Sequence, residues 1–171
     1  MRPFAWFLLG ALAGIVGTVM VYSLNPIFRG DEGETAGGGN VRLVLDADAV
    51  ASLAEVVAGD LARPMAEQPQ VSAEAVIQTS GLIELQLQAR VGDAAAAEGS
   101  VTFDPEIVDG TLVLDVNRDG LPGLVDAQAL AEGMARRLDS WFALVTLGRP
   151  YRVVAIATVD GRFAIELAFT D

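Results

Sequence analysis

The segment at residues 82–91, LIELQLQARV, constrains the fold most, because apolar and polar side chains alternate along it without a break. The apolar set is Ile83, Leu85, Leu87, Ala89 and Val91, and the polar set is Glu84, Gln86, Gln88 and Arg90. Side chains that alternate with a period of two point to opposite faces of a strand. One face is therefore buried and the other meets water, which is typical of an antiparallel sheet.

Further segments carry the same pattern and extend the predicted sheet. Residues 41–45 alternate through Val41, Leu43 and Leu45. VTFDPEI (101–107) and TLVLDV (111–116) follow the first segment and flank the turn formers Asp109 and Gly110, with Leu112, Leu114 and Val116 on the buried face. Residues 152–170 predict two strands joined at Asp160-Gly161, a pair favoured in type I′ hairpin turns, with Phe163, Ile165, Leu167 and Phe169 on one face.

Two helices are predicted from apolar residues that recur every three or four positions. The first follows Asp46 and Asp48, carries Val50, Leu53, Val57 and Leu61, and ends at Pro64. The second covers about 124–145 and carries Leu130, Met134, Leu138, Trp141, Phe142 and Val145. The order of strand, helix, antiparallel strands, long helix and hairpin predicts an α+β fold, in which one face of a curved antiparallel sheet is wrapped against two helices.

An N-terminal transmembrane helix is predicted before this domain. Residues 3–24 carry no charge and are long enough to span a bilayer, with Trp6 and Tyr22 near the two ends. A cleaved signal peptide with its site at residues 21–23 is the alternative. We therefore expect an anchor at 1–28, a flexible, acidic, Gly-rich linker at 29–40, and one α+β domain at 41–171.

The charges that flank the span predict its orientation. Arg2 and the free amine precede it, whereas Arg29 is soon followed by acids, so a cytoplasmic N-terminus and an extracytoplasmic domain are expected. Gly10 and Gly14 form a G-x-x-x-G pair, which lets two helices approach closely. A homodimer contact through this pair is one interpretation; the other is that small residues are common in any membrane helix.

Composition excludes several functions. The chain has 23 acidic residues against 11 arginines and no lysine, so its net charge of −12 argues against nucleic acid and against broad docking on an anionic bilayer. It has no Cys and no His, which removes Ser-His-Asp and Cys-His catalysis and thiolate or imidazole metal sites. No G-x-S-x-G elbow surrounds any serine. No enzyme activity and no cofactor are therefore expected.

The stretch DVNRDGLPGLVD, residues 115–126, has the oxygen-ligand spacing of a calcium loop. It resembles the loop of an EF-hand and, more closely, that of a dockerin. The resemblance implies ligation by the side chains of Asp115, Asn117 and Asp119, by the carbonyl of Leu121 and by Asp126. Pro122 lacks the backbone N–H that pairs such loops, and no helix precedes the stretch. We favour a turn that leads from a strand into the second helix, with Asp126 at the helix N-terminus, and no metal.

The whole layout resembles bacterial single-span proteins of the YpmS and LmeA type, which are related to the tubular lipid-binding (TULIP) superfamily. The similarity is carried by VRLVLDADAVASLAEVV (41–57), by residues 82–91 and 101–123, and by the helix and hairpin that follow. It implies a strongly curved sheet that wraps a long helix and holds acyl chains. The function that it implies is a membrane-tethered, non-enzymatic domain of the cell envelope that binds a lipid or a lipid-linked ligand.

If such a groove lies between sheet and helices, the apolar faces of the two helices should line it. The expected lining residues are Leu53, Val57, Leu130, Met134, Trp141 and Phe142. Two alternatives stay open at this point. The same stripes can fill a closed core, and the domain can be an assembly module that binds a partner protein, with or without a calcium-stabilised loop.

Overall fold

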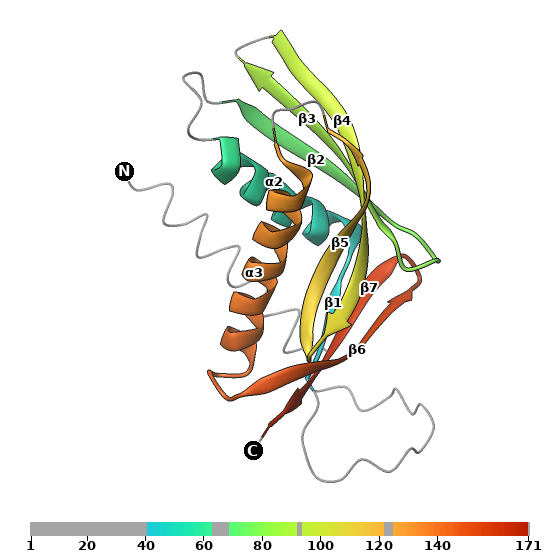
Figure 1. The fold of residues 1–171 in the computed structure, drawn as a ribbon, viewed down its shortest axis with the longest axis vertical. Coiled ribbons are helices and arrows are strands. Elements are labelled where there is room, and N and C mark those ends of the chain that lie inside the picture. The colour runs from blue at the N-terminus through green and yellow to red at the C-terminus, as the bar shows by residue number, and fades with distance from the viewer. Residues whose placement is uncertain (1–40, 63–68, 92–93, 122–124, 171) are drawn as a thin grey trace.

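The computed structural model describes residues 41–62, 69–91, 94–121 and 125–170, which form an α+β fold (Figure 1). The helices are α2 (Ala47–Ala62) and α3 (Ala127–Val145). The strands are β1 (Val41–Leu45), β2 (Gln70–Ile77), β3 (Ile83–Val91), β4 (Ala94–Val108), β5 (Thr111–Gly120), β6 (Tyr151–Val159) and β7 (Arg162–Phe169). The predicted fold class and both predicted helices are confirmed.

The strands form two antiparallel sheets rather than the single curved sheet that was predicted. One sheet has the order β1-β7-β6 and the other the order β2-β3-β4-β5. They meet where the backbone N–H of Val153, in β6, donates to the carbonyl of Gly110 at 2.7 Å, at the turn between β4 and β5. The first and last strands of the domain therefore close one sheet, and the central meander forms the other.

One hydrophobic core joins both sheets to both helices. It holds Leu43 and Ile165 from the first sheet, Leu85 and Phe103 from the second, and the apolar faces of α2 and α3. On β3 four of the five predicted inward residues, Ile83, Leu85, Leu87 and Ala89, are at most 7 % exposed, and Val91 at the end of the strand is partly exposed. The helices lie on one side of the strands, and α3 runs roughly along the long axis of the domain (Figure 1).

Local chemistry explains where these elements begin and turn. The carboxylate of Asp46 accepts the backbone N–H of Ala49 at 2.9 Å at the start of α2, which replaces one hydrogen bond that the helix cannot make itself. At Asp160-Gly161 both residues have positive φ, 52° and 69°, as the predicted type I′ turn requires. The Asp109-Gly110 turn has the same signature. These turns set the register of the β6–β7 and β4–β5 hairpins.

No helix within the described part of the chain is long and apolar enough to cross a membrane. The predicted anchor at 1–28, the linker at 29–40 and the Gly10/Gly14 contact lie outside the described residues. The first described residue is Val41, where β1 begins.

Candidate functional site

An apolar hollow, here called the distal hollow, opens at one end of the β2-β3-β4-β5 sheet. Its lining comes from the end of α2, the inner face of β2 to β4, and the residues between β5 and α3. The described lining residues are Ala62, Pro69, Val71, Leu87, Ala89, Ala97, Glu98, Leu121 and Val125. With the open space at its mouth the hollow measures about 350 Å³, and only a small part of this space is enclosed. Only the tip of an apolar group fits inside without displacing side chains.

Small side chains create this hollow. Ala89 pairs with Val71 on one side and with Ala97 on the other, so a row of small residues crosses three strands. Two positions earlier on β3, Leu87 pairs with Ala73 and Gly99. Further along, Leu85 and Ile83 are almost completely buried, and large side chains fill the core. The side-chain volume in the core therefore decreases toward the distal end, because alanine stands there in place of leucine and isoleucine.

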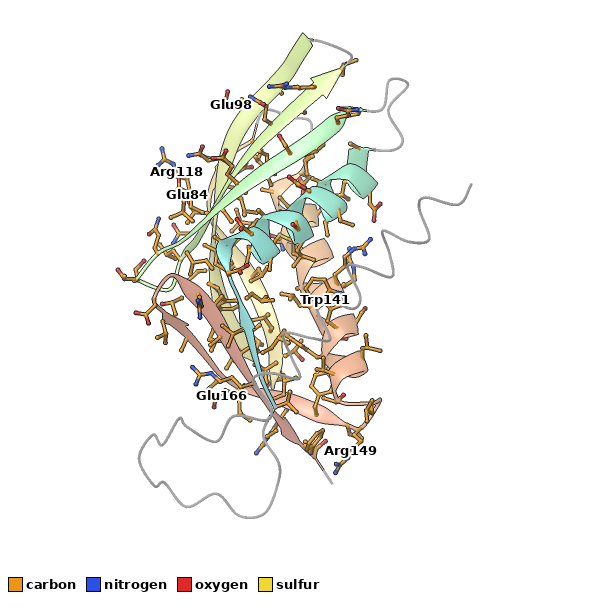
Figure 2. All side chains as sticks on the ribbon, turned by 180° about the vertical axis from the view of Figure 1, so that it is seen from behind. Glu84, Glu98, Arg118, Trp141, Arg149 and Glu166 are labelled. Atoms are coloured by element: carbon orange, nitrogen blue, oxygen red, sulfur yellow. The ribbon has the colours of Figure 1, made fainter. Side chains whose placement is uncertain are left out.

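Glu98 is the one charged residue among the described lining residues, and it is exposed. Figure 2 labels it at the end of the molecule opposite Arg149. It pairs with Gln88, next to the inward pair Ala89 and Ala97, so its carboxylate points to the outer, polar face of the sheet and not into the hollow. Every other described lining residue is apolar, so the site favours contact with hydrocarbon.

The six predicted groove residues lie in the core and do not line the distal hollow. Leu53, Val57, Leu130, Met134 and Phe142 are each at most 4 % exposed, and Trp141 is half-buried against them. Between α2 and α3 the packing is close, since a Cβ on Gly133 would stand 2.4 Å from Cγ1 of Val57. At these positions the space between helices and sheets is filled, which corresponds to the closed-core alternative.

The strand before the predicted turn is longer than expected, because β5 continues beyond Val116 to Gly120. Arg118 pairs with Thr102 and Val116 with Phe103, so Asn117 is the extra residue of a β-bulge. The ladder with β4 thus overrides the local turn preference of Asn-Arg-Asp-Gly. The candidate ligands Asp115, Asn117 and Asp119 are exposed along this strand instead of enclosing a common centre.

The two remaining calcium candidates have structural roles. Leu121 donates its N–H to Oδ1 of Asp119 at 3.0 Å, and its side chain contributes to the distal hollow. Asp126 is the N-cap of α3 and accepts the N–H of Ala129 at 2.7 Å. Since Asp126 stands before the helix, α3 starts three residues later than the predicted 124. Among the described residues, no group of three or more acidic side chains could hold a metal ion.

A second hollow, here called the proximal cleft, lies at the opposite end of the domain. With the open space at its mouth it measures about 740 Å³, about twice the distal hollow measured in the same way, and it is open to solvent. Its lining residues come from the β4–β5 turn, the last turns of α3 and the start of β6, namely Gly110, Thr111, Asp139, Ala143, Gly148, Arg149, Pro150, Tyr151 and Val153. Nothing in the sequence pattern indicated this cleft, because its residues are scattered over 44 positions.

Tyr151 is the most perturbed ionisable group in the described part of the chain. Its hydroxyl lies 3.0 Å from the carbonyl of Asp139 and also donates to the carboxylate of that residue. Burial raises the pKa of Tyr151, and the hydrogen bond to Asp139 and its negative charge raise the pKa further. The ring meets Phe142 edge-on, with centroids 6.0 Å apart. The phenol therefore stays protonated and serves as a hydrogen-bond donor, not as a nucleophile or a base.

Comparisons of the chain with models of protein families, with curated proteins and with solved structures give no match.

Proposed function

We propose that this chain is a membrane-tethered, non-enzymatic domain of the cell envelope that binds the apolar chain of a lipid or lipid-linked molecule. The distal hollow carries the proposal, because eight of its nine described lining residues are apolar. Each methylene that leaves water for such a site contributes about 0.8 kcal/mol. Since little of the hollow is enclosed, the end of one chain enters and the rest lies across the mouth. The proposed extracytoplasmic location follows from the charges that flank residues 3–24.

The apolar lining of the hollow bears on the choice of probe. Since the one charged lining residue, Glu98, points to the outer face of the sheet, the probe is chosen for its acyl chains and not for a charged headgroup. Monomeric dioctanoyl phosphatidylcholine is therefore a suitable probe, and its heat of binding to a fragment of residues 38–171 can be measured by calorimetry. Circular dichroism first establishes that the fragment is folded. Native mass spectrometry of the purified full chain shows whether a lipid is carried over from the host cell.

Filling the hollow should abolish this binding. Ala97→Leu places a larger side chain at the rim, where the residue is half-buried, and Ala89→Phe fills the interior. If two or three methylenes lose their site, about 1.6–2.4 kcal/mol is lost, which weakens binding about 15- to 60-fold. Ala157→Leu is the matched control, because the same change is made on an exposed residue of β6 outside the hollow. A probe that binds Ala97→Leu as well as it binds the unaltered fragment would contradict the proposed site.

The result also separates lipid binding from the assembly alternative. A folded fragment that carries no lipid and gives no heat with the probe leaves the proposed function without support. A partner protein that binds such a fragment would then favour the assembly module. Because Ala89→Phe can destabilise a buried site, the milder Ala97→Leu variant decides the question when the two disagree.

A further inference from the structure

The end of the domain opposite the distal hollow is also the end at which the chain enters. Val41 and Val153 both pair with Leu167, from its two sides, so the starts of β1 and β6 lie at the same end of the sheet, on either side of β7. Tyr151, the first residue of β6, pairs with Phe169. The last turn of α3 leads directly into β6 (Figure 1). We call this region, which contains Val41 and residues 144–153, the proximal end.

The proximal end carries two projecting leucines. Leu147 is 89 % exposed, the largest exposed fraction among the large apolar residues that the structure describes, and Leu144 is 62 % exposed. Both leucines lie at the end of α3, where the chain turns toward β6. Because a hydrogen bond joins the two residues in one turn, they form a single apolar projection that is suited to contact with an apolar surface.

The backbone holds Leu147 in this position instead of leaving it loose. Its φ of 55° lies in the left-handed region, which is unfavourable for a leucine. Hydrogen bonds fix the turn on both sides, because Leu147 donates to the carbonyl of Leu144 at 3.1 Å and Gly148 donates to Ala143 at 2.8 Å. The surrounding hydrogen bonds thus maintain a strained backbone conformation that keeps the Leu147 side chain exposed. This arrangement suits a contact with something outside the domain.

Positive charge flanks the two leucines. Arg149 is exposed, and its guanidinium lies 4.1 Å from the centre of the Phe169 ring, which holds it at the proximal end (Figure 2). Arg152 is also exposed. The nearest acid of the cleft, Asp139, accepts the hydrogen bond of Tyr151. An apolar tip with arginines beside it is the arrangement that fits a lipid surface, with leucine among the acyl chains and guanidinium groups at the phosphates.

The chain before the domain places that surface within reach. Sixteen residues, 25–40, separate the uncharged run at 3–24 from Val41. Even fully extended they span only about 55 Å, so the proximal end cannot move far from a membrane that holds residues 3–24. This step depends on the proposed membrane tether. We infer that Leu144 and Leu147 insert into the surface of the membrane that carries the tether, so that the domain stands on the bilayer with its proximal end down.

The absence of cysteine makes a direct test possible, because a single introduced thiol can be labelled selectively. The full chain with Leu147→Cys, labelled with an environment-sensitive fluorophore, is reconstituted into vesicles of phosphatidylcholine and phosphatidylglycerol. The matched control is Val159→Cys. It is also an exposed apolar residue, 49 % exposed, at the other end of β6 and about 26 Å from Tyr151 along the strand. Lipids with spin labels near the headgroup then quench any fluorophore that lies in the bilayer surface.

We expect blue-shifted, lipid-quenched emission from the label at position 147 and water-like, unquenched emission from the label at position 159. Leu144→Gln should lower the equilibrium constant for insertion of this turn about tenfold, so that lipid quenching of the label at position 147 falls. Equal quenching at both positions, or none at position 147, overturns the inference. A blue shift at position 147 without lipid quenching overturns it as well, since a second copy or another protein then covers the leucines.

Flotation of the same vesicles separates this inference from the proposed function. If the chain floats with the vesicles and position 147 stays in water, the tether stands and the docking of the proximal end is refuted. If the chain does not float, the tether and the docking are both refuted, whereas lipid binding at the distal hollow is judged by calorimetry alone.

Discussion

The contact between α2 and α3 at Gly133 gives the sharpest test of whether the helix faces form a closed core. A Cβ at this position would stand 2.4 Å from Cγ1 of Val57, a distance that real Cβ contacts essentially never show. Val57 is 4 % exposed, and a valine in a helix has one strongly preferred rotamer, so its methyl group cannot turn away. Gly133→Ala should gain about 1 kcal/mol of helix propensity but lose about 1–3 kcal/mol through overpacking. We expect a net loss of up to about 2 kcal/mol.

The partner substitution should reverse this loss. Val57→Ala alone removes two methyl groups from the core and should cost about 2–3 kcal/mol, from lost burial plus a small cavity. In the double variant, the methyl group at position 133 occupies the vacated space, because the next atom of Val57, its Cβ, is an ordinary 3.7 Å away. The clash disappears, and the gain in helix propensity returns. The double variant should therefore be no less stable than Val57→Ala, with a coupling energy of about 2 kcal/mol.

Urea unfolding of residues 38–171, followed by the fluorescence of Trp141, measures all four free energies of unfolding. Trp141 is the one tryptophan in that fragment, and it packs against the core, so its emission reports on loss of the core. Effects that add within about 0.5 kcal/mol would show that the helices do not touch at this point. A Gly133→Ala variant that is stabilised would show the same. Either result would favour a groove between the helix faces over a closed core.

Three further results are expected. Asp126→Ala should cost about 1 kcal/mol of stability and Asp126→Asn almost nothing, because Asn caps a helix as well as Asp does. Since Asp126 acts as this cap, the melting temperature should not respond to millimolar calcium. Tyr151 is the one tyrosine in residues 38–171, and in an alkaline titration its phenol should ionise above the usual pKa of about 10. Asp139→Asn should lower the raised pKa but not return it to the usual value, because burial is the larger cause of the shift. Since the pKa is raised in the folded state, stability is fully present below pH of about 10 and falls as pH rises beyond it, which pH-dependent urea melts can measure. Arg137→Ala, which removes the ion pair with Asp60, should cost at most about 1 kcal/mol and less at high salt, because both side chains are well exposed.

Strong alternation predicted the strands well, and weak alternation did not. β3 and β7 bury leucine, isoleucine and phenylalanine on one face, which gives a clear period of two. β2 has the same geometry but was missed, because its inner face carries Val71, Ala73 and Ala75, whereas Val76 points outward and is 53 % exposed. The edge strand pairs with β3 along its length, and α2 adds a contact, since Oε1 of Glu55 accepts the N–H of Ala73 at 2.9 Å. Such a contact over 18 positions leaves no local signal.

The apolar stripes of the helices showed that a face is buried but not what covers it. Leu53 and Met134 were equally suited to a groove and to a core, and packing at Gly133 decides in favour of the core. The distal hollow could not be predicted for the opposite reason. It exists where side chains are small and where segments from residue 62 to residue 125 come together, so no window of the sequence carries it.

The β4–β5 hairpin relates the two ends of the domain to each other. Ala97 lines the distal hollow, and Gly110, at the other end of the hairpin, lines the proximal cleft. Thirteen residues of extended chain between them correspond to about 43 Å, which exceeds the thickness of one lipid leaflet. If the proximal end stands on the tether membrane, a lipid in that membrane cannot reach the distal hollow while its headgroup stays in the bilayer. The ligand must then be a lipid that has left the bilayer completely or a chain presented from the far side. A quenching signal from lipids of the tether membrane at Ala97→Cys would contradict this arrangement.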